Sequence, residues 1–285
     1  MQLNPTVSIV LPALNAQPHL RQAISSMLDQ TFEDFELIVL EDGSSDDSLE
    51  YLKSLTDPRL RIFHDGLNKG LVCRLNQGIA LSRGKYICRM DADDISMKDR
   101  LLLQTQFLDA NSDIDLVGGV AIGFNGSKGL VGYLPFELTH ERLCARPWNR
   151  IPLPHPTWMA RRDWFEKYRY RTPEVLRAED QDLLIRAYPT SRYSCVPETV
   201  LAYRLRVFPL KSLLISRFNL VRAQVRTFYQ RKQPIYLMLA VLVFFVKSAL
   251  DFTAKFRIIN LLFARYRTPS SWVFNESEIK KRLRI

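Results

Sequence analysis

Hydrophobic and polar positions form alternating blocks over the first 90 residues of the chain. Runs of β-branched and apolar residues predict strands at 7–11, 35–40, 60–63 and 85–90. Apolar residues at helical spacing predict helices over 20–28, 49–55 and 71–82. This alternation is typical of a mainly parallel sheet covered by helices, in which ligands bind outside the carboxyl ends of the strands. The strand ends near Pro12, Asp42 and Asp91 would then share one rim.

The second part of the chain continues this order and then becomes harder to assign. We expect a helix over 97–110 and a strand over 113–124. Residues 125–160 are rich in Gly, Pro and aromatic residues and resemble loops threaded with short strands. Residues 180–188 predict another helix.

Composition places the chain among globular proteins. With 285 residues and 47% hydrophobic positions, it is long enough to bury a sizeable core. Its four cysteines lie far apart without a CxxC pair, which indicates neither a disulfide framework nor a zinc site and fits a reducing, cytosolic setting. The opening residues MQLNPTVSIVLP lack a basic segment followed by a long apolar run, so we expect no secretion signal.

The net charge of +10 is unevenly distributed along the chain. Residues 1–185 hold 21 Lys/Arg and 26 Asp/Glu, whereas residues 186–285 hold 19 Lys/Arg and 4 Asp/Glu. A basic tail of this kind could meet nucleic acid or anionic lipid, and the apolar residues mixed into it must decide between them.

The stretch RMDADDI places three carboxylates directly after a predicted strand. One interpretation is a helix start, with Ser96 and Asp99 as a capping box and Asp94 in the turn before it. That leaves Asp91 and Asp93 unexplained, because like charges at a strand end cost free energy unless a cation or hydrogen-bond donors meet them. Oxygen ligands without His or Cys select Mg²⁺ or Mn²⁺, which takes further ligands from substrate phosphates. We therefore expect a metal site that binds a diphosphate.

A second acidic turn, EDGSSD, closes the predicted strand at 35–40. Gly43 suits the turn, and Ser44 with Asp47 matches a capping box for the next helix. Asp42 has no role in that interpretation. Its carboxylate could accept a hydrogen bond from a uracil imide N–H or from a ribose hydroxyl, so one rim would hold base, ribose and diphosphate in sequence.

Together these segments resemble the family 2 glycosyltransferases, inverting enzymes of the GT-A fold that use nucleotide-sugar donors. The resemblance covers residues 7 to about 204 and is carried by SIVLPALNA, LEDGSSDDS, LNKGLVCRLNQGIALSRGKYI and MDADD. It implies a Rossmann-like, mainly parallel α/β sheet with flanking helices. It assigns Asp42 to the base, Asp91 to the ribose or the metal, and Asp93 to a metal that bridges both phosphates. Glu41 stands where the family often has Asp and is a further candidate base contact.

Five more positions follow from the same comparison of motifs. The resemblance marks Pro12 and Asn15 in the opening Pro-x-x-Asn turn, and Asn68 in the central segment, as candidates for substrate binding. Arg74 could contact a phosphate or the base, although an exposed helical arginine commonly meets only water. HPTWMARRDW resembles a segment of bacterial polysaccharide-building members, with His155 in the acceptor region; an ordinary loop histidine is the alternative.

The stretch LRAEDQDLLIRAY resembles the family's acidic motif, where a carboxylate acts as general base. Asp180 occupies that position, and Glu179 beside it is a candidate for substrate binding. Displacement at the anomeric carbon needs such a base on the face opposite the departing diphosphate. The alternative is a helix N-terminus that favours acids, with Asp182 and Arg186 as an i,i+4 pair, and we keep this interpretation for Asp182.

The basic tail predicts a membrane-associating region. We expect a basic amphipathic helix over 209–230, followed by the charge-free run IYLMLAVLVFFV at 235–246. That run is shorter than the ~20 residues that cross a bilayer, so we expect it to be embedded and not to span. The flanking cations, which suit an anionic cytoplasmic leaflet, are Arg231, Lys232, Lys255, Arg257, Arg265 and Arg267. A helical appendage packed on the protein, or an oligomer contact, is the alternative.

These patterns lead to one expectation and two rivals. We expect a catalytic domain over 1–205 and a helical membrane-associating region over 206–285, at the inner face of the plasma membrane. With Mn²⁺ or Mg²⁺, the enzyme would move a sugar from a UDP-sugar to a glycan or lipid-linked hydroxyl in cell-surface polysaccharide synthesis. A phosphatase would use the first aspartate of DADDI as nucleophile, although Ile95 replaces its usual Thr or Val. A nucleic-acid binder would explain the basic tail but not its apolar run.

Overall fold

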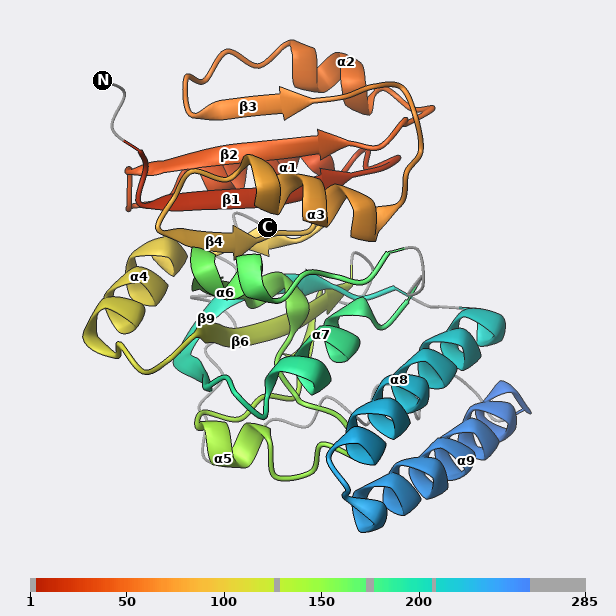
Figure 1. Ribbon diagram of the computed structural model, residues 1–285. Helices are drawn as coiled ribbons and strands as arrows, with labels where there is room; N and C mark the ends of the chain where they lie inside the picture. Colours follow the sequence, from red (N-terminus) through yellow and green to blue (C-terminus); the bar gives the residue numbers. More distant parts are fainter. Residues whose placement is uncertain (1–3, 126–128, 173–176, 207–208, 257–285) are drawn as a thin grey trace.

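The computed structural model describes residues 4–125, 129–172, 177–206 and 209–256. Within them, one mixed sheet has the strand order β3-β2-β1-β4-β8-β6-β9-β5, with β7 paired to β6 (Figure 1). The strands are β1 (Val7–Ala13), β2 (Phe35–Glu41), β3 (Leu60–Phe63), β4 (Tyr86–Arg89), β5 (Ile95–Ser96), β6 (Leu116–Asn125), β7 (Gly129–Tyr133), β8 (Met159–Arg161) and β9 (Tyr193–Arg204). The helices are α1 (Leu20–Leu28), α2 (Ser48–Lys53), α3 (Leu71–Leu81), α4 (Arg100–Ala110), α5 (His140–Leu143), the 3-10 turn η1 (His155–Thr157), α6 (Arg162–Lys167), α7 (Glu179–Ala187), α8 (Leu210–Gln230) and α9 (Pro234–Phe256).

The N-terminal half of the sheet confirms the predicted parallel α/β architecture. β1 lies between β2 and β4, and β3 pairs with β2, all in parallel. Every residue of β1 and β2 is buried, which explains why both strands are mainly apolar and do not alternate. The polar Ser8 and Glu36 are hydrogen-bonded to each other at 2.6 Å. Ile9 and Leu11 pack toward α1 on one face of the sheet, whereas Val10 and Leu40 pack toward α3 on the other.

The carboxyl ends of these strands form one rim, as predicted. β2 ends at Glu41 and β4 at Arg89, so Asp42 and Asp91 follow the ends of the two strands that flank β1. Pro12 lies inside β1 opposite Leu40, beyond the last residue of β1 that pairs with β4. A residue without an N–H is tolerated at such a half-paired position.

The other half of the sheet contains a long strand that the sequence pattern did not reveal. β9 runs parallel to β6, and its pairing shifts where Val196 lies opposite Gly119 and Thr199 opposite Val120. Pro197 and Glu198 are therefore left out of register and are exposed. This bulge interrupts the alternation of apolar residues, which is why the strand was not assigned. β9 ends at Arg204, whose backbone N–H binds Asp94 in the loop between β4 and β5.

Both predicted capping boxes are wrong. Ser96 belongs to β5, which pairs with β9, so α4 begins only at Arg100 and not near residue 97. The Asp99 carboxylate caps no N–H of α4 and accepts a hydrogen bond from the Thr31 hydroxyl at 3.0 Å. Likewise, α2 begins at Ser48 without a side-chain cap from Asp47. In both places long-range pairing overrides the local motif.

A hairpin of two long helices follows the sheet. α8 packs against α7 on one side and against α9 on the other (Figure 1). α8 confirms the helix predicted over 209–230. α9 is longer than the charge-free run at 235–246, because it continues through Lys247 to Phe256. The predicted cations Arg257, Arg265 and Arg267 lie outside the described residues.

Candidate active site

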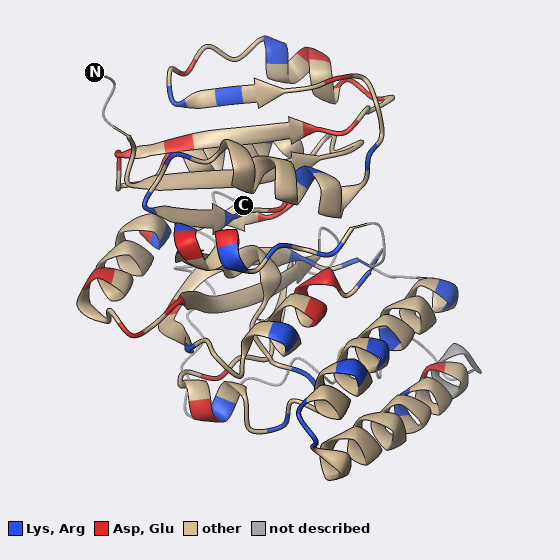
Figure 2. Cartoon of the chain, in the orientation of Figure 1, with Lys and Arg blue, Asp and Glu red and all other residues tan. Residues whose placement is uncertain are grey.

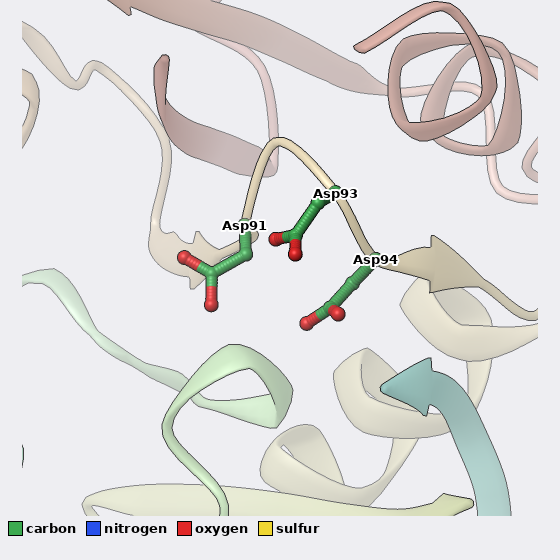
Figure 3. A group of neighbouring side chains, drawn as sticks. All are labelled: Asp91, Asp93 and Asp94. Carbon is green, nitrogen blue, oxygen red and sulfur yellow. The ribbon is translucent and has the colours of Figure 1, made fainter. Parts of the chain in front are cut away.

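Three carboxylates meet in the loop between β4 and β5. One oxygen from each of Asp91, Asp93 and Asp94 lies within 4.8 Å of the others, and the side chains point to the same side of the loop (Figure 3). Burial raises the pKa of the Asp93 carboxyl, and the nearby Asp91 raises it further. Burial, with Asp91 and Asp93, raises the pKa of Asp94 well above its usual range. This arrangement is costly in the absence of a cation.

The cluster fits a divalent metal ion. Its ligands are all hard oxygens, which Mg²⁺ and Mn²⁺ prefer. Oδ1 of Asp94 accepts a hydrogen bond from the N–H of Arg204 at 2.8 Å, whereas Oδ2 is buried without a hydrogen-bond partner among the described residues. Asp94 was assigned from the sequence only to a turn, so the structure adds it to the predicted pair Asp91 and Asp93. The third carboxylate of MDADD was the signal that could have revealed it.

Arginines from β9 and its extension hold this cluster together. Arg206 donates from Nε to Oδ2 of Asp93 at 2.7 Å, and its Nη2 lies 2.6 Å from the same oxygen. Arg204 donates from Nε to the carbonyl oxygen of Asp93 at 2.9 Å. Neither arginine was a sequence candidate, because β9 itself was not assigned.

Arg89 brings a buried positive charge to the centre of the site. Its side chain is 5% exposed and forms an ion pair with Asp91. Its Nε and Nη1 atoms are buried and make no hydrogen bond within the described part of the chain. The positive charge opposes ionisation of the His155 imidazole, whose pKa is already lowered by burial. Arg89 therefore influences both the carboxylate cluster and the acidic helix that faces it.

The acidic N-terminus of α7 forms the opposite wall. Burial raises the pKa of Glu179 to about 7, with Asp180 as the second cause. Burial also raises the pKa of the Asp180 carboxyl. Ala178, which precedes the helix, has a left-handed backbone with φ of 60°, a strained conformation for a residue with a Cβ. Gln181 fixes the helix end to a neighbouring loop by two hydrogen bonds with the backbone of Ile151, each 3.1 Å.

His155 and Asp182, two residues in or near the acidic motif, have different partners. Nδ1 of His155 lies 3.8 Å from Oε1 of Glu179, and Nε2 lies 2.6 Å from the Tyr170 hydroxyl. His155 is therefore a buried, partnered residue next to the acidic motif and not an exposed loop histidine. Asp182 pairs with Arg186 at 2.9 Å, which confirms the structural role that we kept for it.

Asp42 lies on the rim directly after β2 and is held by three hydrogen bonds. Its Oδ1 accepts hydrogen bonds from the Lys69 N–H at 2.8 Å and from Arg74 Nε at 2.8 Å, and its Oδ2 accepts from the Gly70 N–H at 3.0 Å. Oδ2 thus keeps acceptor capacity for a base or a ribose. Asp42 also ties the loop after β3 to the loop after β2.

Arg74 is fully buried, so the expectation of a solvated surface arginine is wrong. Its five N–H groups bind Asp42, Asp65, Gln77 and the Leu67 carbonyl. No donor remains for the phosphate or base contact that we considered. Arg74 orders the rim and does not contact a ligand from this conformation.

The remaining candidates shape the turn after β2. Glu41 is buried, and its carboxylate accepts hydrogen bonds from the Gly43 and Ser44 N–H groups. Oδ1 of Asn15 accepts from the Ser45 N–H at 2.8 Å. Asn68 is exposed on the neighbouring loop. Gly43 has φ of +74°, and a Cβ there would lie 2.9 Å from the Asn68 nitrogen, so only glycine fits the contact between the two loops.

Comparison with known proteins identifies the family of this chain. Residues 8–169 match the model of the family described as glycosyl transferase family 2. A relative from Haemophilus influenzae, described as an uncharacterized glycosyltransferase, is 30% identical over 72% of this chain and 67% of its own length. Bacillus subtilis EpsJ, also described as an uncharacterized glycosyltransferase, is 31% identical over 70% of this chain and 61% of its own length.

Two solved structures share the fold. Residues 1–349 of Staphylococcus aureus TarS, in complex with UDP-GlcNAc, superpose with a TM-score of 0.69 and 18% identity over 90% of this chain and 77% of that one. The mannosyltransferase PcManGT from Pyrobaculum calidifontis, in complex with GDP-Man and Mn²⁺, superposes with a TM-score of 0.59 and 13% identity over 93% and 85% of the two chains. At these identities the likeness establishes the GT-A-like fold alone.

The buried pair between Asp42 and Arg74 generates a stability prediction. Asp42→Asn removes the charge and turns an amide donor toward a backbone N–H or the guanidinium, so it should lower the free energy of unfolding by about 2–4 kcal/mol. Urea denaturation measures this loss. Asp109→Asn, in an exposed pair with Lys85, is the matched control and should cost less than about 1 kcal/mol. Equal losses in both variants would show that burial of the pair is unimportant.

Arg206 generates a prediction about metal binding. Its guanidinium binds Oδ2 of Asp93 and competes electrostatically with a cation for that carboxylate. Arg206→Gln should therefore tighten binding of Mn²⁺ alone by about two- to fivefold, the range of a partly exposed ion pair. Calorimetric titration with MnCl₂ in the absence of nucleotide measures this effect, and Lys211→Gln controls for the loss of one positive charge. Unchanged or weaker binding in Arg206→Gln would contradict the competition.

Proposed function

Because this chain belongs to glycosyl transferase family 2, we propose that it transfers a sugar from a UDP-sugar to a hydroxyl of a glycan or lipid-linked acceptor, with inversion and with Mn²⁺ or Mg²⁺. One observation carries the proposal: a trio of carboxylates and a separate pair of acidic residues face the same buried arginine. The TarS complex with UDP-GlcNAc supports the choice of donor. The phosphatase and nucleic-acid alternatives gain no support from the comparisons.

Asp91, Asp93 and Asp94 would hold the metal ion. When bound, the ion would supply positive charge to the leaving diphosphate. The PcManGT complex with Mn²⁺ supports this choice of cofactor. The chain itself contributes the orientation of the ligands, since Arg204 fixes Asp94 through its backbone N–H and Asp93 through its carbonyl oxygen.

Asp180 is the proposed general base. It lines a cavity of about 520 Å³, whereas Glu179 lies beside His155 and away from that lining. As the acceptor oxygen attacks the anomeric carbon, the bond from that carbon to the diphosphate breaks and the hydroxyl proton passes to the Asp180 carboxylate. Burial raises the pKa of this carboxyl and so makes its carboxylate a stronger base. Glu179 and the neutral His155 hold the acidic wall in place, a positioning role that the buried contact with Tyr170 supports.

The hairpin of α8 and α9 is the proposed membrane contact. Large apolar side chains of α9 that are more than half exposed recur at helical spacing: Ile235, Met238, Leu242, Phe245, Val246, Leu250 and Phe252. Basic residues lie along the neighbouring α8 (Figure 2). Together they suit an anionic bilayer surface, which supports the proposal that the enzyme acts at the inner face of the plasma membrane in cell-surface polysaccharide synthesis.

α9 could in principle cross a membrane. By length and composition, Pro234–Phe252 is long and apolar enough to cross a membrane. However, Lys247 donates to Asn149 and Asp251 pairs with Arg217, so one side of α9 is tied to the protein. These contacts favour a helix that lies in the surface, as the shorter charge-free run already indicated.

Two substitutions test donor and acceptor chemistry separately. Asp93→Ala should abolish Mn²⁺-dependent stabilisation by UDP-GlcNAc or a related UDP-sugar, measured as a rise in melting temperature. Asp180→Asn should keep that rise but lower transfer of labelled sugar into a membrane extract by about 10²–10⁴-fold. Because the base works deprotonated and burial raises its pKa, wild-type transfer should fall on acidification at a pH above the ordinary aspartate range of about 4.

Asp163→Asn, at an exposed carboxylate on α6, serves as control and should change neither readout. A fully active Asp180→Asn variant would move the base elsewhere. Retained metal-dependent donor binding in Asp93→Ala would remove Asp93 from the metal site.

The exposed stripe of α9 generates a prediction about membranes. Leu242→Glu with Phe245→Glu places two charges on the apolar face and should reduce sedimentation with vesicles containing anionic phospholipid by at least tenfold, while donor binding stays unchanged. Leu138→Glu, at an exposed apolar residue of the catalytic unit, should leave vesicle binding intact. If the double variant binds vesicles as the wild type does, the apolar face has another partner.

A further inference from the structure

The cavity beside Asp180 carries a positive charge that the transfer reaction itself does not require. Building on the proposed function, the geometry points to an acceptor that carries a phosphate group, bound by Arg217 of α8 and Lys247 of α9 while its hydroxyl meets Asp180. No motif identified in the sequence foretold this site, because its lining residues come from several separate segments between Leu134 and Lys247.

The cavity lies between the catalytic unit and the helical hairpin. One wall consists of Asp180 at the start of α7 and Tyr203 of β9, and the other of Arg217 and Lys247. Burial raises the pKa of the Tyr203 hydroxyl, and Asp91 and Asp94 raise it further, so this wall adjoins the carboxylate cluster. A volume of about 520 Å³ lies within the range of ~300–1,000 Å³ that is usual for small-ligand sites. A ligand here would reach both the base and the hairpin.

The charge of the lining favours an anion. Among the described residues that line the cavity, Arg150, Arg217 and Lys247 are cations, whereas Asp180 is the one carboxylate. A neutral sugar would need hydrogen-bonding groups but no excess of cations. A phosphate can accept two parallel hydrogen bonds from an arginine guanidinium and can pair with the ammonium charge of a lysine.

Both hairpin cations are held in position before any ligand binds. Asp251 accepts from Nε and Nη2 of Arg217, and Asn149 accepts from Nζ of Lys247. Nη1 of Arg217 makes no hydrogen bond with a described residue, so it remains available as a donor at the cavity. Such preorganisation reduces the entropy lost when an anion binds.

The rest of the lining indicates where the phosphate comes from. Apolar side chains such as Ile151, Leu213 and Leu220 surround the cations. The exposed apolar stripe belongs to the same hairpin, on the helix that contributes Lys247. A phosphate that links a sugar to a lipid would satisfy both surfaces at once, whereas a phosphate within a soluble glycan would use the cations alone.

The test compares phosphate probes on the full-length protein. Calorimetric titrations with farnesyl phosphate, inorganic phosphate and farnesol are carried out in EDTA, which keeps metal away from the carboxylate cluster. Farnesyl phosphate should bind at least tenfold more tightly than farnesol. Arg217→Gln should weaken its binding by about tenfold, because a charge-assisted hydrogen bond is lost. Lys247→Gln should weaken it in the same direction.

A matched variant separates ligand binding from support of the hairpin. Asp251→Asn breaks the same ion pair as Arg217→Gln but keeps the guanidinium and removes its competing anion, so phosphate binding should stay or tighten. Arg222→Gln, at an exposed arginine of α8, controls for net charge and should have no effect. Equal weakening by Arg217→Gln and Asp251→Asn, or equal binding of farnesyl phosphate and farnesol, overturns the inference.

The third probe identifies the source of the phosphate. Inorganic phosphate that binds as tightly as farnesyl phosphate, with the same loss in Arg217→Gln, supports a phosphate-bearing soluble glycan. Weaker binding of inorganic phosphate supports a lipid-linked acceptor. The Mn²⁺-dependent rise in melting temperature with UDP-GlcNAc is recorded for the same variants. If this rise persists while Arg217→Gln leaves phosphate binding unchanged, only the acceptor assignment fails. If the rise is absent from the wild type, the proposed function fails.

Discussion

Carboxylates gathered at the carboxyl ends of parallel strands repel one another, and the structure pairs three of them with an arginine, whereas Asp94 accepts a hydrogen bond from a backbone N–H. Asp42 is paired with Arg74, Asp91 with Arg89, and Asp93 with Arg206. A buried carboxylate without a nearby positive charge is more easily protonated, and an arginine or a bound cation favours its charged form. The folded state therefore depends on arginines that arrive from α3, β4 and the end of β9.

The three pairs differ in burial, and this difference separates their roles. Arg74 is inaccessible and uses all its donors, so it builds the rim and cannot move to a ligand. Arg206 is 57% exposed and joins Asp93 from the segment that follows β9, so a metal ion can replace it at modest cost. Arg89 stays buried between the carboxylate cluster and the acidic helix. Any change of charge at the cluster is consequently felt by Glu179, whose pKa depends on burial and on its acidic and basic neighbours.

Local patterns predicted most of the parallel half of the fold and the rim residues, because continuous apolar strands and short polar turns leave few alternatives. They predicted Asp91 and Asp93 together, and placed Asp42 on the same edge. They failed where partners are distant in sequence. The capping box at Ser96 and Asp99 lost to pairing of β5 with β9, and the bulge at Pro197 concealed β9 itself. Arg204 and Arg206 were missed with it, and Arg74 was misjudged because a helical pattern does not reveal burial under a loop.

Polar and charged contacts also hold the helical hairpin, and they bear on the proposed membrane contact. Lys247 and Asp251 lie one turn apart on α9 and bind Asn149 and Arg217, while residues such as Leu242 and Phe245 are exposed. Moving α9 across a bilayer would either break these contacts or carry both charges into hydrocarbon. A charged residue at the centre of a membrane-spanning helix costs about 2.5–3.5 kcal/mol or more. Lying in the surface avoids both costs. It would also keep Arg217 and Lys247 at the cavity that Asp180 lines, so the contacts that tie α9 to the protein would also complete the proposed acceptor site.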